Sequence, residues 1–174
     1  MSDITTMPFT YAIVHDGARC LIFKKKKHGH FFQRQAVNPK ADLHGGGKYC
    51  FPGGSQTEAN PIIGARREFR EETGIVVPTD VIREWKFTEG DGTGCCFEIP
   101  ADALTALHAS VSRQLEMANS DDWTNEDCKV QDNELKNPEL VPLANLPGDY
   151  FRADDKDTGW FHSFVTRLKA ELEK

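Results

Sequence analysis

A glycine pair followed by a helix with clearly marked ends constrains this chain more than any other part of its sequence. The pair is Gly53-Gly54, and the helix follows after a short turn. Asn60 is suited to cap the first helical turn, and Pro61 suits the first helical position. Gly74 can adopt the left-handed conformation that ends a helix. The spacing therefore predicts a helix over residues 61–73 that starts beside a tight turn.

The predicted helix has one apolar face and one acidic edge. At about 100° per residue, the apolar face consists of Ile62, Ala65 and Phe69. Glu68 and Glu72 lie together along one edge of that face, and Glu71 lies one step further out. Three carboxylates therefore project to one side of the helix.

This grouping of carboxylates is unfavourable in isolation. Like charges within one turn repel each other, and the helix macrodipole disfavours negative charge near the C-terminus. The neighbouring cations Arg66, Arg67 and Arg70 offset part of that repulsion. A divalent cation would offset more of it, because Mg²⁺ prefers carboxylate oxygens and is commonly completed by substrate phosphates. A solvated helix with mixed charges is the alternative for such a pattern on its own.

At these residues the sequence resembles the Nudix hydrolase superfamily, the MutT-like proteins. The superfamily signature ends in R-E-U-x-E-E-x-G-U, where U is aliphatic or aromatic, and residues 67–75 read REFREETGI. This segment fits the signature at every position. A match of this length, placed after a Gly-Gly turn and a capped helix start, is specific. The resemblance in motif covers residues 53–75.

The first half of the signature departs from the family pattern. When the helix starts are aligned, the position of the family's earlier glutamate is occupied by Ala59. The turn after Gly53-Gly54 is one residue short, and Glu58 is adjacent to the changed position. In the family this glutamate supports the loop and the helix, whereas the later glutamates hold the metal. Two alternatives therefore stand: a Nudix hydrolase with a reshaped loop, and a catalytically impaired Nudix-like module that binds a nucleotide or a protein.

The resemblance implies a fold and a chemistry. The implied fold is α/β, the Nudix α/β/α sandwich with a mixed β-sheet. The implied chemistry is Mg²⁺-dependent cleavage of the pyrophosphate bond in a nucleoside diphosphate linked to another group, with Mn²⁺ as the alternative ion. The implied metal ligands are Glu68, Glu71, Glu72 and the backbone carbonyl of Gly53. Glu71 or Glu72 would take a proton from the attacking water, and Arg67 would orient the acidic side chains.

Other residues are candidates for catalysis or substrate binding. Some family members take the water's proton with an acid from a later loop. The acids in that part of this chain are Asp121, Asp122, Glu126, Asp127 and Glu134. An exposed acidic loop is the other explanation for these residues. The candidate substrate-binding residues are Phe51, Gly54, Lys48 and Trp123.

The class of substrate stays open among nucleoside triphosphates, sugar nucleotides, dinucleotides and capped RNA. Some subfamilies carry a marker Pro or Tyr beyond the signature, in a region that reads DGT at residues 91–93 here. Residues 24–35, KKKKHGHFFQRQ, combine cations with aromatic side chains, so an RNA end is also a candidate partner. A solvated loop is the alternative for that segment.

The rest of the chain predicts strands interleaved with helices. Residues 9–14 and 19–23 are expected to form an antiparallel hairpin. A long connection over residues 24–47 then leads to a short strand. The expected strands after the hairpin are residues 48–51, 75–77, 81–87 and 95–99.

Two further helices are expected, over residues 101–118 and 158–173. Residues 121–138 are expected to form an exposed polar connection with one short strand near residues 128–130. Core packing is the expected role of Trp85 and Trp160.

Composition sets the remaining expectations. A chain of 174 residues has the length of one domain, so residues 1–174 are expected to form a single domain with an extended region at 101–138. A net charge of −6 does not attract polyanions, so phosphate binding has to come from local arrangement. Without a signal peptide or an apolar membrane span, a cytoplasmic location is the expectation. The five cysteines are expected to be reduced, and a dimer is an open alternative to a monomer.

Overall fold

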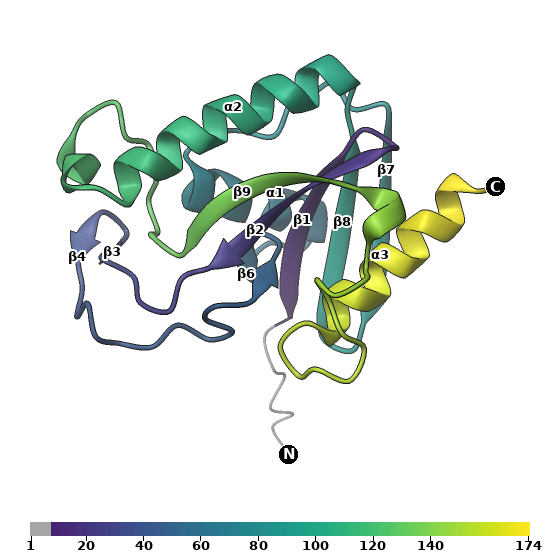
Figure 1. Ribbon diagram of the computed structural model, residues 1–174, viewed down its shortest axis with the longest axis horizontal. Helices are drawn as coiled ribbons and strands as arrows, with labels where there is room; N and C mark the ends of the chain where they lie inside the picture. Colours follow the sequence, from purple (N-terminus) through teal and green to yellow (C-terminus); the bar gives the residue numbers. More distant parts are fainter. Residues whose placement is uncertain (1–7) are drawn as a thin grey trace.

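The structure is a computed structural model that describes residues 8–174 (Figure 1). The N-terminus, to which the expectation of no signal peptide applies, lies outside the described residues. The strands are β1 (Phe9–His15), β2 (Arg19–Lys25), β3 (Phe31–Phe32), β4 (Gln35–Ala36), β5 (Tyr49–Cys50), β6 (Gly53–Ser55), β7 (Arg83–Glu89), β8 (Gly92–Glu98) and β9 (Leu135–Pro142). The helices are α1 (Pro61–Thr73), α2 (Ala101–Ala118) and α3 (Gly159–Leu172), with short 3₁₀ turns η1 (Asp121–Thr124) and η2 (Leu143–Asn145).

A mixed sheet forms the centre of the molecule. Its strands run in the order β5-β2-β1-β8-β7, with β6 also paired to β1 and β9 to β2. β1 and β8 are parallel, from Phe9 opposite Gly92 to His15 opposite Glu98. The other strand pairs of this sheet are antiparallel, including the predicted β1–β2 hairpin. β3 and β4 form a separate small hairpin at one end of the molecule, opposite α3 (Figure 1).

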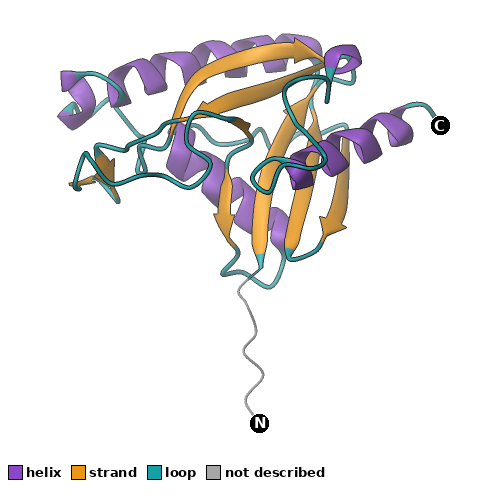
Figure 2. Cartoon of the chain, turned by 60° about the horizontal axis from the view of Figure 1, so that its bottom comes forward, coloured by secondary structure: helices purple, strands orange, loops and turns teal. Residues whose placement is uncertain are grey.

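Helices cover both faces of the sheet, as successive residues of β1 show (Figure 2). The Thr10 hydroxyl donates to the Pro61 carbonyl at the start of α1, at 2.7 Å. The Tyr11 ring points to the other face and meets the Phe161 ring of α3 edge-on at 4.9 Å. This alternation is the period of a strand whose two faces are both buried. The expected α/β/α sandwich with a mixed sheet is confirmed.

The ends of α1 are those that the sequence predicts. The Asn60 side chain accepts a hydrogen bond from the Ile62 N–H at 2.9 Å. Gly74 adopts a left-handed conformation with φ +77°, and its N–H donates to the Arg70 carbonyl. The two other predicted helices are also confirmed, as α2 and α3.

The predicted strand over residues 75–77 is wrong. The carbonyls of Val77 and Pro78 accept hydrogen bonds from the Arg66 guanidinium, at 3.0 and 3.2 Å, and so do not pair with a strand. The Ile75 N–H is bound by the Thr73 hydroxyl. Side chains of α1 therefore satisfy the backbone here.

The strand predicted near residues 128–130 is also wrong, and the surrounding connection is less exposed than expected. The Lys129 N–H donates to the Gln114 side chain. The N–H groups of Gln131 and Asp132 donate to the Glu71 carbonyl, near the end of α1. Val130, Asp132 and Asn133 are buried, and β9 begins directly afterwards. Long-range contacts thus draw this polar segment into the fold.

All five cysteines are free and buried, and four of them lie in strands, in agreement with the expected reduced state. Among residues 8–174, no helix combines the length and the apolar character needed to cross a membrane.

Candidate active site

The carboxylates of α1 are packed against the glycine pair of β6. Glu68 and Glu72 are buried, and Glu71 is half-buried. One carboxylate oxygen of Glu72 accepts a hydrogen bond from the Gly53 N–H at 2.7 Å. A Cβ at Gly54 would lie 2.8 Å from Glu68 Oε1, closer than side chains tolerate. At Gly54 the flexible Glu68 side chain can move aside, but a Cβ at Gly53 would lie 2.3 Å from the Thr10 carbonyl oxygen, so glycine is required at Gly53.

Arg67 joins the acidic residues of the helix to each other. Its Nη1 donates to Glu68 at 3.2 Å and to Glu71 at 3.0 Å. Its Nη2 donates to the Ser55 carbonyl in β6 at 3.0 Å. The planar guanidinium thus holds two carboxylates and the glycine turn in one arrangement.

Glu58 contacts Arg67 even though the turn before α1 is one residue short. Arg67 Nε donates to Glu58 Oε2 at 2.8 Å, and Nη2 donates to Oε1 at 3.3 Å. These hydrogen bonds lower the pKa of Glu58 to about 2. The Gln56 side chain closes the turn by donating to the Glu58 carbonyl at 2.8 Å. An acid therefore reaches Arg67 from the position before Ala59.

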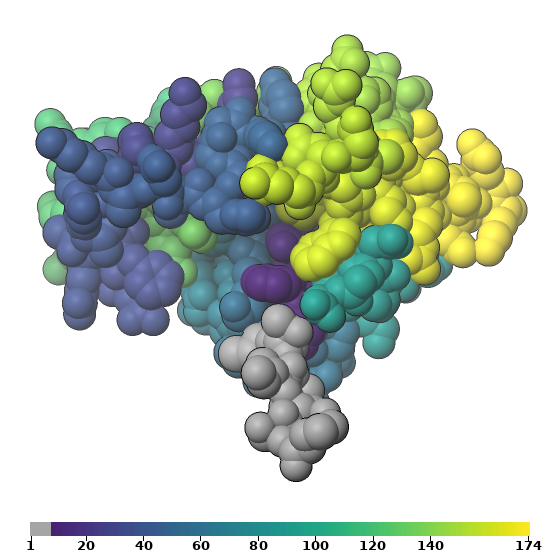
Figure 3. Space-filling view, turned by 90° about the horizontal axis from the view of Figure 1, so that it is seen from below, coloured from purple at the N-terminus to yellow at the C-terminus, as the bar shows by residue number. Residues whose placement is uncertain are grey.

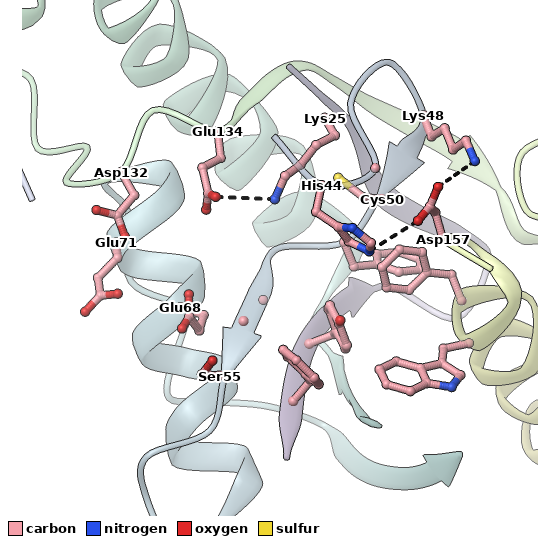
Figure 4. Close-up of a pocket in the computed structure, with 18 of the residues that line it drawn as sticks. Lys25, His44, Lys48, Cys50, Ser55, Glu68, Glu71, Asp132, Glu134 and Asp157 are labelled. Atoms are coloured by element: carbon pink, nitrogen blue, oxygen red, sulfur yellow. Dashed lines mark hydrogen bonds and ion pairs between the residues drawn. The ribbon is translucent and has the colours of Figure 1, made fainter. Parts of the chain in front are cut away.

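The carboxylate face of α1 forms one wall of a cleft of about 640 Å³, lined in part by Glu68 and Glu71. The other walls come from β1, β5, β6, the β3–β4 hairpin, the loop before β9 and the start of α3. Figure 3 shows atoms of β1 recessed between the segment before β6 and the start of α3. In Figure 4, Glu68, Glu71, Asp132 and Glu134 lie on one side, and His44, Lys48 and Asp157 lie opposite.

Two acids of the later loop line this cleft, namely the candidate Glu134 and also Asp132, which was not among the candidates. The N–H groups of Gln131 and Asp132 both donate to the Glu71 carbonyl, at 2.7 and 3.0 Å. This anchor brings Asp132 and Glu134 into the cleft wall. The candidates that do not line the cleft are Asp121, Asp122, Glu126 and Asp127.

Acids outweigh cations in the deepest part of the site. Burial raises the pKa of Glu68 to about 7 against the charge of Arg67. Burial also raises the pKa of Glu72 well above its usual range, and the neighbouring carboxylate of Glu134 adds to the rise. Burial opposes the charge of Lys25, but Glu72 and Glu134 raise its pKa overall. Lys25 Nζ lies 3.5 Å from Glu134 Oε1 (Figure 4).

The donor atoms fit a hard divalent cation, although residues 8–174 contain no ready-made group of three metal-binding His, Cys, Asp or Glu side chains. The second carboxylate oxygen of Glu72 is buried without a hydrogen-bond partner. Its neighbour Glu134 is another acid, and the raised pKa of Glu72 keeps that carboxyl protonated unless a cation lies between the two. A buried anionic oxygen is costly unless a cation pairs with it. Carboxylate oxygens are the donors that Mg²⁺ and Mn²⁺ prefer.

The structure brings three of the four candidate substrate-binding residues to the cleft. Phe51, Gly54 and Lys48 line it. The Lys48 ammonium is shared between Asp155 at 3.0 Å and Asp157 at 2.7 Å. Trp123 does not line the cleft, so its expected ligand contact is not supported. Its ring stacks on Phe31 at 4.8 Å instead.

Several lining residues were missed as site residues, among them Tyr11, Lys25 and Trp160. Tyr11 lies on the α3 face of β1, so the alternation of that strand is the signal that could have found it. Trp160 is half-buried, and it packs against the core as expected and also lines the cleft at the start of α3. The glycine-bearing β7–β8 turn makes room for it, because a Cβ at Gly92 would lie 2.5 Å from its ring.

The basic run before the hairpin is not one patch. Lys24 lies over the Tyr49 ring at 5.3 Å, and Lys25 faces the cleft. Lys26 is buried and donates to the Asn133 side chain, whereas Lys27 is exposed. Neighbouring lysines therefore serve different partners, which weakens the case for a nucleic-acid surface there.

Solved structures of similar shape share little sequence with this chain. A MutT protein from Methanosarcina mazei Go1 has a TM-score of 0.49 and 17% identity over 100% of both chains. A mutT/nudix family protein from Listeria innocua has a TM-score of 0.49 and 14% identity, over 96% of this chain and 94% of the other. A MutT structure from work on Aliivibrio salmonicida and Vibrio cholerae has a TM-score of 0.47 and 15% identity, over 95% and 98%. At these values the likenesses say nothing about the chemistry of the site.

The sequence match is more extensive. No curated protein matches the chain. The NUDIX domain family, however, matches residues 14–164, which include both the carboxylate helix and the acids of the later loop. The chain therefore belongs to the NUDIX domain family, the hydrolases of pyrophosphate bonds.

Proposed function

We propose that the protein is a Mg²⁺-dependent hydrolase that cleaves the pyrophosphate bond of a nucleoside diphosphate linked to another group. The observation that supports this most is the buried Glu72, which lies beside Glu134 and has one oxygen without a partner. Such a group of acids is best explained by a cation bound among them. The cleft beside them is within the usual size range for small-molecule sites.

The residues of the signature hold the ion in this proposal. Glu68, Glu71, Glu72 and the Gly53 carbonyl would be its ligands. When bound, Mg²⁺ neutralises charge on a diphosphate and lowers the pKa of a coordinated water. Arg67 keeps two of the carboxylates in place through the contacts described above. Phe51, Gly54 and Lys48 are proposed to contact the substrate, whereas Trp123 is not.

Glu134 is the acid to which we assign the proton of the attacking water. Glu72 is tied to the Gly53 N–H, and Glu71 is tied to Arg67, so both are suited to hold the ion. Glu134 has a longer contact, with Lys25 at 3.5 Å, and remains half-exposed to the cleft. A less constrained carboxylate at the cleft surface is the better proton acceptor. Glu71 and Glu72 are the alternatives.

The rival function, an impaired binding module, rested on Ala59 and the shortened turn. Glu58 now contacts Arg67 from the adjacent position, so the loop and the helix are still connected by an acid–arginine pair. This observation favours the enzyme. Tight nucleotide binding without turnover would support the rival instead.

The proposal is tested by hydrolysis of a nucleotide panel with Mg²⁺, with Mn²⁺ and with a chelator. The panel should contain nucleoside triphosphates, sugar nucleotides, dinucleotides and capped RNA. We expect metal-dependent cleavage of at least one class, with ¹⁸O from labelled water in a phosphate product. An absence of cleavage across the panel with both ions would contradict the proposal.

A further inference from the structure

We infer that the cleft takes a dinucleotide, a substrate with an aromatic base at each end of its phosphate chain. This inference rests on the proposed cleavage of a diphosphate and names the class of substrate. It follows from aromatic side chains at two separate ends of the cleft, with the carboxylates between them.

The first aromatic end lies at the start of α3. The Trp160 ring is 6.3 Å from the Tyr11 ring and 5.9 Å from the Phe9 ring, and all three residues line the cleft while only partly buried. Partly exposed rings in a concave site are suited to stack on a flat base.

The second aromatic end lies on the β3–β4 hairpin. Phe32 lines the cleft and is 51% exposed, although it is a large apolar side chain. Its neighbour Phe31 points the other way and is buried against Trp123. The exposed part of the Phe32 ring at the rim of the cleft is available to contact a ligand.

The hairpin is fixed in a way that keeps Phe32 at the rim. Gln33 and Arg34 have positive φ angles of 51° and 63°, which are unfavourable for residues other than glycine. Two backbone contacts hold this turn: the Gln33 N–H donates to the Asp132 carboxylate at 2.8 Å, and the Arg34 N–H donates to the Gln131 carbonyl at 2.9 Å. The position of Phe32 is therefore determined by the loop that also carries the cleft acids.

Direct contacts place the carboxylates between the two ends. From one end, Tyr11 is paired with Gly53, whose N–H binds Glu72. From the other end, Gln33 binds Asp132, whose N–H binds the Glu71 carbonyl. Figure 1 agrees, because the β3–β4 hairpin and α3 lie on opposite sides of the molecule.

This arrangement distinguishes among the candidate substrates. A nucleoside triphosphate or a sugar nucleotide would place a base at one aromatic end and leave the other end without a partner. A dinucleotide would fill both ends and bring its phosphates to the carboxylates. Capped RNA is disfavoured, because the lysines before the hairpin do not form one surface for a longer strand.

The decisive experiment is a binding comparison that does not depend on turnover. Two ligands carry the same uncleavable methylene-bridged phosphate chain and the same charge. One has adenosine at both ends, and the other has adenosine at one end and a methyl ester at the other. Calorimetry in Mg²⁺ measures both with the wild type, with Phe32→Ala, with Phe32→Tyr and with Val37→Ala. Val37 is a matched control, because it is an exposed apolar residue near the hairpin that does not line the cleft.

The wild type and Val37→Ala should bind the two-base ligand about 5- to 150-fold more tightly, the range for stacking one base on an aromatic ring. Phe32→Ala should reduce that ratio to near one, and Phe32→Tyr should restore it. Equal binding of both ligands by the wild type, or an unchanged ratio in Phe32→Ala, would overturn the inference. Failure of hydrolysis across the nucleotide panel would contradict the proposed function without changing this result.

Discussion

The two ends of β1 each lie beside a buried titratable group with one polar atom lacking a hydrogen bond. At the cleft end, the group is Glu72, which accepts a hydrogen bond from the Gly53 N–H. Gly53 in turn pairs with Tyr11 of β1. At the other end, the group is His15, whose Nε2 has no partner. Both groups have one polar atom without a hydrogen-bond partner, but the residues around them differ.

The imidazole of His15 avoids the cost of burial by staying neutral. Its Nδ1 accepts a hydrogen bond from the Gly17 N–H at 3.0 Å, and its ring stacks on Trp85. Burial lowers the pKa of His15 to about 4, although the acids Glu98 and Asp16 oppose the shift and Arg83 supports it. No cation or ligand is needed to explain a neutral ring.

Protonation likewise relieves the burial of Glu72, but its surroundings differ, because burial and the acids Glu134 and Glu68 raise its pKa against the charge of Lys25. A single orphaned atom is therefore weak support for a site. Several acids around the same atom, in the wall of a cleft, are stronger support.

The first prediction concerns the acid next to Glu72. Glu134→Gln should lower kcat by about 10²- to 10⁴-fold with a small change in KM, because the amide cannot take the proton of the attacking water. Steady-state kinetics on the substrate found in the panel measures this. Glu139→Gln changes an exposed acid of β9, the strand that directly follows Glu134, and should leave kcat unchanged. Equal kinetics of the two variants would remove Glu134 from the mechanism.

The second prediction concerns His15 and has a defined sign. The pKa of about 4 in the folded protein is below the usual value of 6.5, so only the unfolded chain takes up this proton as pH falls from 6.5 to 4. Stability from this group is complete above pH 6.5 and declines by about 3 kcal/mol toward pH 4. His15→Asn, which keeps an acceptor for Gly17, should show that much less loss in denaturant titrations over the same window. The exposed His28→Asn should behave as the wild type, and an unchanged slope in His15→Asn would refute the neutral-ring account.

The third prediction concerns the displaced acid beside Arg67. Glu58→Gln should lower kcat/KM by roughly 10- to 100-fold, the range for residues that orient metal ligands. Glu84→Gln is the matched control, because Glu84 pairs with the adjacent Arg66, at 3.3 Å. Mn²⁺ titration should show weaker binding in Glu58→Gln alone. If both variants bind Mn²⁺ equally well, Glu58 does not replace the family's earlier glutamate.

The fourth prediction concerns the helix that carries the carboxylates. Asn60→Ala should lower the free energy of unfolding by about 1 kcal/mol, because it removes the acceptor for the Ile62 N–H. Chemical denaturation measures this loss. Asn38→Ala removes a similar contact in an exposed turn, to the Lys40 N–H, and should cost less. Equal losses would mean that the cap contributes little to holding α1 in place.

The carboxylate helix could be predicted because its determinants are local. Asn60, Pro61 and Gly74 fix its ends within the segment itself, and helical spacing places Glu68 and Glu72 on one edge. The β1–β2 hairpin and α2 could be predicted for the same reason. Short-range preferences and side-chain periodicity are readable without knowledge of the tertiary structure.

The remainder of the site depends on contacts between distant parts of the chain. Asp132 and Glu134 reach the cleft because the end of α1 binds the backbone before β9. Phe32 and Trp160 meet the same cleft from segments far apart in the sequence. Trp123 was expected near the ligand because it lies in a polar segment, but its ring stacks on Phe31 of the hairpin. The spacing of residues along the sequence does not predict such contacts.

The most direct test of the account compares wild type with Glu71→Gln for Mn²⁺ binding and for Mg²⁺-dependent hydrolysis of the nucleotide panel. The substitution removes one charge at nearly constant shape, and Glu116→Gln, an exposed acid of α2, is the control. We expect turnover in the wild type and the control, with both metal binding and turnover lost in Glu71→Gln. Unchanged metal binding and turnover in Glu71→Gln would contradict the claim that the carboxylates of α1 form the metal site.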